Sequence, residues 1–162
     1  MCDFCSSDEA ETFLSKISAS GGGDLQEAVM DGLYVALNEV SWRKDADKFL
    51  FLVLDSPPHG TRFYQGGDGF PDGCPCGHSE ATLLPQLRDM EIDFTIIKVK
   101  STIDKMIEIF SQYTNIEVFY PKIFQDNSRT VMRSADFVDS VKGEMRKQCN
   151  SKLTSNLCFY KK

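Results

Sequence analysis

The fold is decided by seven residues, Phe49-Leu50-Phe51-Leu52-Val53-Leu54-Asp55, in which six large apolar side chains run into an aspartate. The apolar run has the length of a core strand, about 4–8 residues, and it lacks the periodicity of an amphipathic helix. Pro57 and Pro58 follow at once and interrupt regular structure. We therefore predict a fully buried strand over residues 49–54, with Asp55 at its carboxyl end.

Asp55 is the first candidate site residue. Ligands of open parallel sheets bind beyond the carboxyl ends of the strands, which is where this carboxylate is expected. The alternative role is structural, because an aspartate also favours a turn such as Ser56-Pro57-Pro58. The local sequence leaves both roles open.

Amphipathic segments and short apolar runs alternate along the chain. Their periodicity predicts strands over about residues 49–54, 93–100 and 116–120, and helices over about 8–17, 24–41, 79–90, 101–110 and 135–149. Asp24 and Glu27 have the spacing of a capping box at the start of the second helix. The alternation predicts an α/β fold with a mainly parallel sheet, and the small number of strands indicates part of a doubly wound domain.

A long segment rich in glycine and proline separates the first strand from the next helix, over about residues 56–79. Loops longer than about 12–15 residues in compact domains are usually functional or disordered. Cys74, Cys76 and His78 stand near its end, and Cys2 and Cys5 lie far upstream, so soft ligands of the kind that zinc takes are present. The Cys-x-Cys-x-His spacing is tighter than a usual zinc hook, so we expect loop thiols and no zinc.

The composition is that of one globular domain: 162 residues, 41% hydrophobic and 26% charged, with 6 cysteines at irregular spacing. A formal net charge of -6 without a basic stripe argues against nucleic acids and anionic membranes as partners. No apolar stretch approaches the roughly 18–20 residues that cross a bilayer, and the amino terminus lacks the features of a signal peptide. We therefore expect reduced cysteines and a cytoplasmic protein.

Several stretches together resemble the von Willebrand factor A (vWA) domain, specifically the vWA-like module of eukaryotic alpha-kinase proteins. The likeness runs from about Phe13 to Thr114. It rests on residues 21–33 (GGGDLQEAVMDGL), Trp42-Arg43, 52–60 (LVLDSPPHG), 70–73 (FPDG) and 101–107 (STIDKMI). The resemblance implies a doubly wound, Rossmann-like fold of three layers, of which this chain holds only part.

The resemblance also implies a divalent cation, usually magnesium, in a metal-ion-dependent adhesion site at the carboxyl edge of the sheet. Asp55 matches the aspartate that follows the fourth vWA strand, and Asp24 is the second candidate ligand, although a helix cap explains Asp24 equally well. The Asp-x-Ser-x-Ser loop and its strand are not found, and Gly23 stands where a threonine is usual. We expect magnesium to bind weakly or not at all, because affinity follows the charge and number of ligands.

The matched region divides the chain into three parts: residues 1–20 as the amino-terminal segment of a truncated vWA domain, 21–120 as its carboxyl half, and 121–162 as a carboxyl-terminal helix and tail. Without the earlier strands, residues 49–54 would form an exposed sheet edge. A fragment of a larger protein, a gene prediction that lacks upstream sequence, and completion by a partner chain all fit, and we favour the first two.

These observations favour a non-catalytic protein-interaction module with one partner surface, the loop edge that contains Gly22, Gly23, Ser56, His59 and Asp72. The partner and the oligomeric state stay open. An alternative is a metal-dependent hydrolase at the same edge, or a regulatory region of an alpha-type protein kinase. The chain has no nucleophile elbow, Walker loop or kinase signature, which favours the non-enzymatic interpretation.

Overall fold

A computed structural model describes residues 3–18, 22–119, 125–126, 129–130, 138–139 and 142–151. The elements are α1 (Ser7–Leu14), α2 (Val29–Asn38), β1 (Lys48–Leu54), α3 (Glu80–Asp89), β2 (Ile92–Lys98), the 3-10 helix η1 (Ser101–Ile103), α4 (Asp104–Phe110), β3 (Glu117–Phe119), β4 (Gln125–Asp126) and β5 (Arg129–Thr130). Residues 142–151 are helical as well. The α/β class predicted from the sequence is confirmed.

The central sheet has three parallel strands in the order β1-β2-β3. β1 pairs with β2 over its whole length, from Lys48 opposite Ile92 to Leu54 opposite Lys98. β3 adds a shorter pairing on the other side of β2. Strands β4 and β5 form a separate antiparallel pair.

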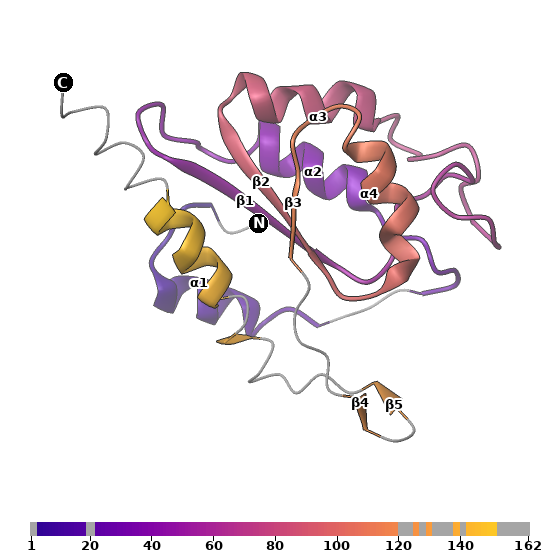
Figure 1. Ribbon diagram of the computed structural model, residues 1–162, viewed down its shortest axis with the longest axis horizontal. Helices are drawn as coiled ribbons and strands as arrows, with labels where there is room; N and C mark the ends of the chain where they lie inside the picture. The colour runs from indigo at the N-terminus through magenta and orange to yellow at the C-terminus, as the bar shows by residue number, and fades with distance from the viewer. Residues whose placement is uncertain are drawn as a thin grey trace.

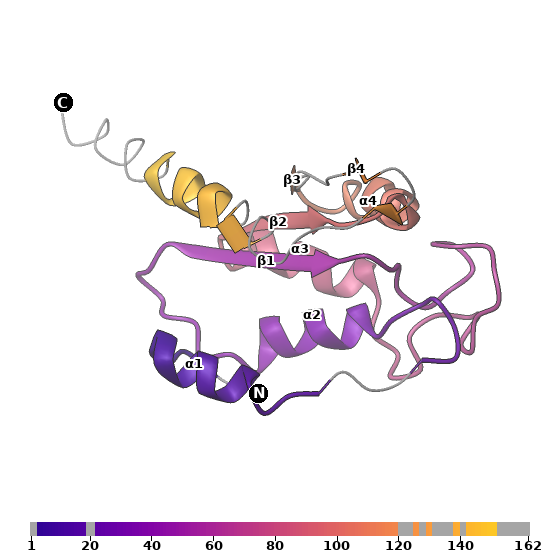
Figure 2. The ribbon, with the colours of Figure 1, turned by 90° about the horizontal axis from the view of Figure 1, so that it is seen from below.

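Helices cover both faces of this sheet (Figure 1). α2, α3 and α4 lie on one face, where their buried side chains share a core with alternate residues of β1 and β2. Successive right-handed crossovers that proceed in one direction along a sheet place their helices on the same face, as α3 and α4 are placed here. Figure 2 shows the helical residues 142–151 on the side of β1 opposite to α2. The three-layer arrangement is therefore present over three strands.

A polar contact joins the second face to helical residues 142–151. The buried Thr95 hydroxyl donates to Gln148 Oε1 at 3.0 Å, and Gln148 Nε2 donates to Glu117 Oε2 at 2.8 Å. Gln148 is only 8% exposed, and these partners satisfy the hydrogen-bonding groups of its buried amide. The helix expected near residues 135–149 is thus found in part, and the rest of that range lies largely outside the described residues.

The amino-terminal boundary of α2 differs from the prediction. The helix begins at Val29 rather than near Asp24, because Glu27 forms an isolated parallel bridge with Pro58, in which its N–H donates to the Pro57 carbonyl at 2.9 Å. The Asp24 carboxylate accepts a hydrogen bond from the Gly69 N–H instead of capping a helix. The predicted capping box at Asp24 is therefore wrong, and a capping box occurs instead at Ser6 and Glu9, where α1 begins.

β1 is an edge strand and is only partly buried. Within the described residues β2 is its one strand neighbour, and Val53 is 47% exposed. The prediction of a fully buried strand is wrong for β1 and suits the central strand β2 better, where Ile96 and Ile97 are completely buried. The expected sheet edge at residues 49–54 is present. No helix in the described part of the chain is long and apolar enough to cross a membrane.

Two leucines differ strongly in burial, so we expect them to contribute very differently to the free energy of unfolding. Leu84 on α3 is 0% exposed, whereas Leu14 on α1 is 65% exposed. We expect Leu84→Ala to lower the free energy of unfolding by about 2–5 kcal/mol, because it removes buried apolar surface and leaves a cavity. The matched control Leu14→Ala should change it by no more than about 0.5 kcal/mol. Urea denaturation followed by circular dichroism measures both, and equal effects would contradict the assigned core.

Candidate functional site

The candidate site lies at the carboxyl end of β1, where the chain enters the loop of residues 55–79 (Figure 1). The segment before α2 runs alongside the start of this loop: Glu27 forms a parallel bridge with Pro58. The buried residues Ser56, Pro57 and Pro58 fix that end of the loop. The structure therefore brings the glycine-rich segment before α2 and the loop after β1 to one edge, as expected from the sequence.

Asp68 organises the first half of the loop. Its side chain is only 1% exposed and accepts hydrogen bonds from two backbone N–H groups, Gly60 at 2.7 Å and Phe70 at 2.8 Å. His59 Nδ1 lies 2.7 Å from the same carboxylate. Burial alone would raise the pKa of Asp68, but the hydrogen bonds from Gly60, His59 and Phe70 outweigh it and hold the pKa below its ordinary value. Asp68 is thus an anionic centre around which the loop backbone is wrapped.

Asp24 joins this centre from the segment before α2. Its carboxylate accepts a hydrogen bond from the Gly69 N–H at 2.6 Å and lies 4.0 Å from His59 Nδ1. One ligand atom from each of Asp24, His59 and Asp68 lies within 4.8 Å of the other two. The group has the composition of a metal-binding set, and the hydrogen bond that Asp24 accepts from Gly69 ties the two segments together.

Asp55 lies in a different environment. Its carboxylate accepts a hydrogen bond from Lys100 Nζ at 2.6 Å, and its backbone carbonyl accepts one from the Thr102 hydroxyl. The hydrogen bond from Lys100, aided by the lysine charge, holds the pKa of Asp55 below its ordinary value although burial opposes this. The side chain is 48% exposed. Asp55 therefore ties the end of β1 to the segment that follows β2.

The described residues around Asp55 do not fit a magnesium site. Lys100 Nζ donates to one oxygen of this carboxylate and would compete with an ion for it, and a magnesium ion needs several oxygen ligands in near-octahedral geometry. Asp24, the second expected ligand, is directed toward Gly69 and His59. Within the described part of the chain, Asp55 belongs to no group of three close histidine, cysteine or acidic side chains. The magnesium assignment stays a prediction from the resemblance.

The residues predicted for the partner surface fall into two classes. Gly22, Gly23 and Asp72 are exposed, as a contact surface requires. Ser56 is 7% exposed and the His59 side chain 12%, so these two residues support the surface from beneath.

Sequence reasoning missed two buried polar side chains at this edge. Asp68 was one polar residue among many in a glycine-rich loop, and no local pattern marked it as buried. Gln26 is 3% exposed, and neither of its amide atoms has a hydrogen-bond partner among the described residues. Burying an unsatisfied amide costs about 1–3 kcal/mol, which makes Gln26 an energetically unfavourable residue beside Glu27 and the loop.

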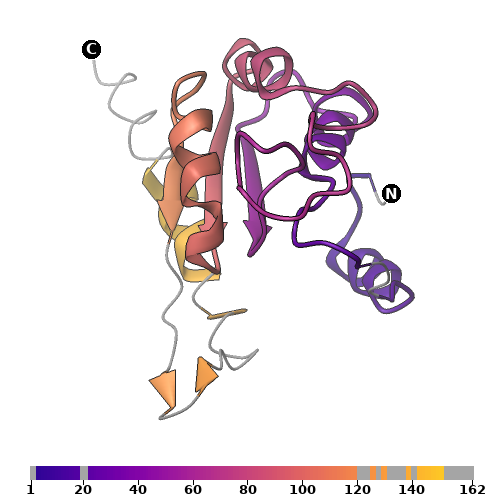
Figure 3. The ribbon, with the colours of Figure 1, turned by 90° about the vertical axis from the view of Figure 1, so that its right-hand side faces the viewer.

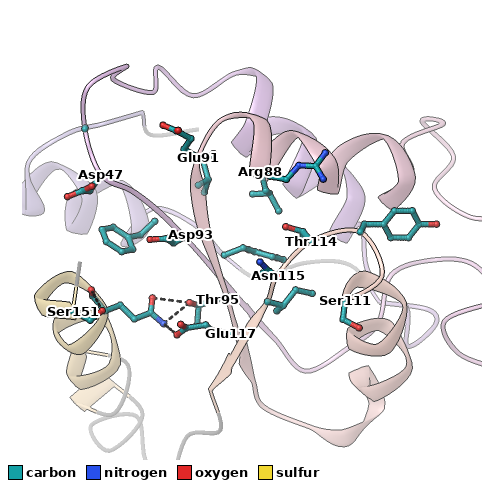
Figure 4. Close-up of a pocket in the computed structure, with 18 of the residues that line it drawn as sticks. Asp47, Arg88, Glu91, Asp93, Thr95, Ser111, Thr114, Asn115, Glu117 and Ser151 are labelled. Carbon is teal, nitrogen blue, oxygen red and sulfur yellow. Dashed lines mark hydrogen bonds between the residues drawn. The ribbon is translucent and has the colours of Figure 1, made fainter. Parts of the chain in front are cut away.

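A cleft of about 810 Å³ lies at the opposite edge of the sheet (Figure 4). It is lined by residues at the starts of β1 and β2, by the turn after α4, and by Gln148 and Ser151 of the helical residues 142–151. Asp47, Glu91, Asp93 and Glu117 give the lining an acidic character. Because ligands of parallel sheets bind at the carboxyl ends, this cleft is not the expected site.

Part of the chain is similar in sequence to the alpha-protein kinase vwkA of Dictyostelium discoideum, with 31% identity over 104 residues. The matched region makes up 63% of this chain and 16% of that kinase, so the chain corresponds to a small part of its relative. No protein-family model matches the chain. The similarity shows a distant and partial relation to an alpha-protein kinase.

The role of Asp68 predicts a pH-dependent contribution to stability. At pH 7, Asp68→Asn should lower the free energy of unfolding by about 1–3 kcal/mol. Gly60 and Phe70 donate to different oxygens of the carboxylate, and the amide replaces one of these oxygens with an NH₂ group that cannot accept a hydrogen bond. Since the folded pKa lies below the ordinary value of 3.8, the carboxylate stabilises the fold above pH 3.8, and this contribution is lost as the pH falls through the folded pKa.

Denaturation curves of the wild type and Asp68→Asn across this pH range measure the effect, with the exposed Asp72→Asn as the control in the same loop. The difference in the free energy of unfolding between the wild type and Asp68→Asn should become smaller in acid. A difference that is constant from pH 7 to pH 2 would show that the charge of Asp68 does not act in this way.

Proposed function

We propose that this chain is a non-catalytic protein-interaction module of the vWA type, part of a larger protein, whose partner surface is the loop edge at the carboxyl end of β1. One observation carries the proposal: a buried carboxylate, Asp68, fixes a loop that holds two exposed aromatic side chains. Tyr64 is 36% exposed and Phe70 is 47% exposed. Aromatic residues in such positions provide much of the binding energy of protein interfaces.

The loop is ordered before any partner binds. The Phe70 N–H donates to Asp68, and the Phe70 ring meets the His59 ring edge-on at a centroid distance of 4.9 Å. A loop that is fixed in this way loses less conformational entropy on binding than a flexible one. Gly22 and Gly23 are exposed and have no side chains, so the neighbouring surface is open to a partner.

The position of His59 supports a structural role rather than catalysis. Its ring is held between Asp68, Asp24 and Phe70, and within the described residues no hydrogen bond joins it to the buried Ser56. A nucleophile and its base are normally within hydrogen-bond reach of one another. The geometry therefore gives no support to hydrolysis by a serine–histidine pair at this edge.

The similarity to an alpha-protein kinase favours a second, compatible function. The chain would then be a regulatory or docking region of an alpha-type kinase, with catalysis in another domain of the parent protein. On this proposal the loop edge binds the kinase's substrate, its regulator or its own catalytic domain.

The partner surface can be tested by photo-crosslinking. We expect a benzoyl-phenylalanine at position 64 to form a covalent adduct with one specific protein in the cells that make this chain, and the same residue at the exposed position of Glu108 on α4 to form none. Phe70→Ala should then weaken binding of the purified partner about tenfold or more, as loss of an aromatic anchor does. Equal crosslinking at both positions, or unchanged affinity of Phe70→Ala, would contradict the proposed surface.

The role of magnesium can be tested on the same edge. We expect the amide signals of Asp24, Asp55 and His59 to respond to magnesium only at millimolar concentrations, because Lys100 occupies the Asp55 carboxylate. Lys100→Met should strengthen the response, and Lys105→Met on α4 should not. Saturation of the wild type at micromolar magnesium would show a true adhesion site. If neither the wild type nor Lys100→Met responds at any concentration, this edge does not bind magnesium.

A further inference from the structure

A second cluster of metal-ligating side chains lies where the end of the loop meets α2. Cys74 Sγ donates to Asp31 Oδ1 at 3.2 Å, and His78 Nε2 lies 3.8 Å from the same oxygen. One ligand atom from each of Asp31, Cys74 and Cys76 lies within 4.8 Å of the other two. These four residues come from two segments that are distant in sequence.

We propose that Asp31, Cys74, Cys76 and His78 form a zinc-binding site. Bonds of about 2.0–2.3 Å in a tetrahedral zinc site place neighbouring ligand atoms about 3.3–3.8 Å apart. The Cys74–Asp31 and His78–Asp31 distances, 3.2 and 3.8 Å, are close to this spacing. Asp31, Cys74 and Cys76 already form a compact group, and the proposed site requires the His78 ring to move closer to the two sulfur atoms.

The backbone and a neighbouring ring arrange these ligands. The Gly77 N–H donates to the Cys74 carbonyl at 3.0 Å, and this turn keeps Cys74 and Cys76 close together. Gly77 has a φ of 78°, a left-handed conformation that glycine adopts at low cost. The His78 ring stacks on Tyr34 at a centroid distance of 4.1 Å and an interplanar angle of 11°. Tyr34 follows Asp31 by three residues, so both side chains lie on one face of α2.

The chemistry of the donors selects the metal. Two thiolates and an imidazole favour zinc over magnesium or calcium, which prefer oxygen ligands. From the sequence, we expected no zinc because the Cys-x-Cys-x-His spacing is tighter than a usual zinc hook. A structural site usually has four protein ligands, and Cys74, Cys76 and His78 are only three. Asp31 supplies the fourth ligand from α2. Cys2 lies outside the described residues, and the proposed site does not require it or Cys5.

Electrostatics shows why a cation suits this position. Without one, deprotonation of Cys74 or Cys76 would place a second negative charge close to the Asp31 carboxylate, which is unfavourable. A dication reverses this balance, because it attracts the carboxylate and both thiolates at once. Zinc would tie the end of the loop to α2, much as Asp24 ties its first half to the segment before α2.

Metal binding by the purified full-length chain tests the site. Under reducing conditions we expect one equivalent of zinc by elemental analysis, and cobalt(II) should give a thiolate-to-metal charge-transfer band together with the visible absorption of a tetrahedral ion. Cys76→Ser leaves one thiolate, so it should lower the charge-transfer intensity to about half and weaken zinc binding by about tenfold or more. Asp31→Asn should weaken it about tenfold or more, whether Asp31 binds the ion directly or orients a ligand.

Cys149→Ser is the matched control, because Cys149 is an exposed free cysteine in the helical residues 142–151. It should bind zinc as the wild type does. Cys76 is exposed as well, so Cys76→Ser should remain folded, and circular dichroism verifies this. Zinc should raise the unfolding temperature of the wild type and Cys149→Ser but not of Cys76→Ser. Absence of a charge-transfer band in the wild type, or undiminished zinc binding by Cys76→Ser, would overturn the proposal.

Discussion

The parallel pairing of β1 with β2 is the constraint on which the rest of the structure depends. Parallel strands need a crossover, and α3 provides it on the face where α2 and α4 also pack. The pairing also aligns the carboxyl ends of the two strands, and the hydrogen bond from the Val99 N–H to the Leu54 carbonyl extends it by one step. Asp55 and Lys100 leave the sheet side by side and form an ion pair for this reason.

Beyond the sheet, the loop edge is held by hydrogen bonds from backbone N–H groups to side-chain carboxylates rather than by regular structure. Asp68 accepts hydrogen bonds from the N–H groups of Gly60 and Phe70, and Asp24 accepts one from Gly69. Phe63 anchors the loop in the hydrophobic core, and the glycine-rich remainder, which has little apolar surface to bury, is ordered by acceptors for its N–H groups. Figure 3 shows this loop beside the segment that leads into α2.

The loop is anchored at two points that differ in chemistry. Its first half is tied through Asp68 and His59 to Asp24, a set of oxygen and nitrogen atoms. Its second half approaches α2 through Cys74, whose thiol donates to Asp31, with His78 nearby. Oxygen and nitrogen donors therefore lie under the proposed partner surface, and the sulfur donors lie against α2. The surface that carries Tyr64 and Phe70 spans the part of the loop between Gly60 and Cys74, close to the first anchor.

The sequence by itself determined the alternation of helices and strands around the central sheet and the parallel pairing of its strands. These features follow from local periodicity and from the positions of proline and glycine, which act over a few residues. The sequence also placed Asp24 and His59 at the same edge, although it assigned Asp24 to a helix cap that does not form.

Only the tertiary structure decided which side chains meet. Asp24 reaches Gly69, Asp31 reaches Cys74 and Lys100 reaches Asp55, and in each pair the two residues are more than forty positions apart. Burial was decided in the same way: β2 is covered on both faces, whereas β1 lies at the edge and leaves Val53 exposed although its sequence is at least as apolar. Contacts between distant segments depend on how strands and helices pack, and no local pattern in the sequence contains that information.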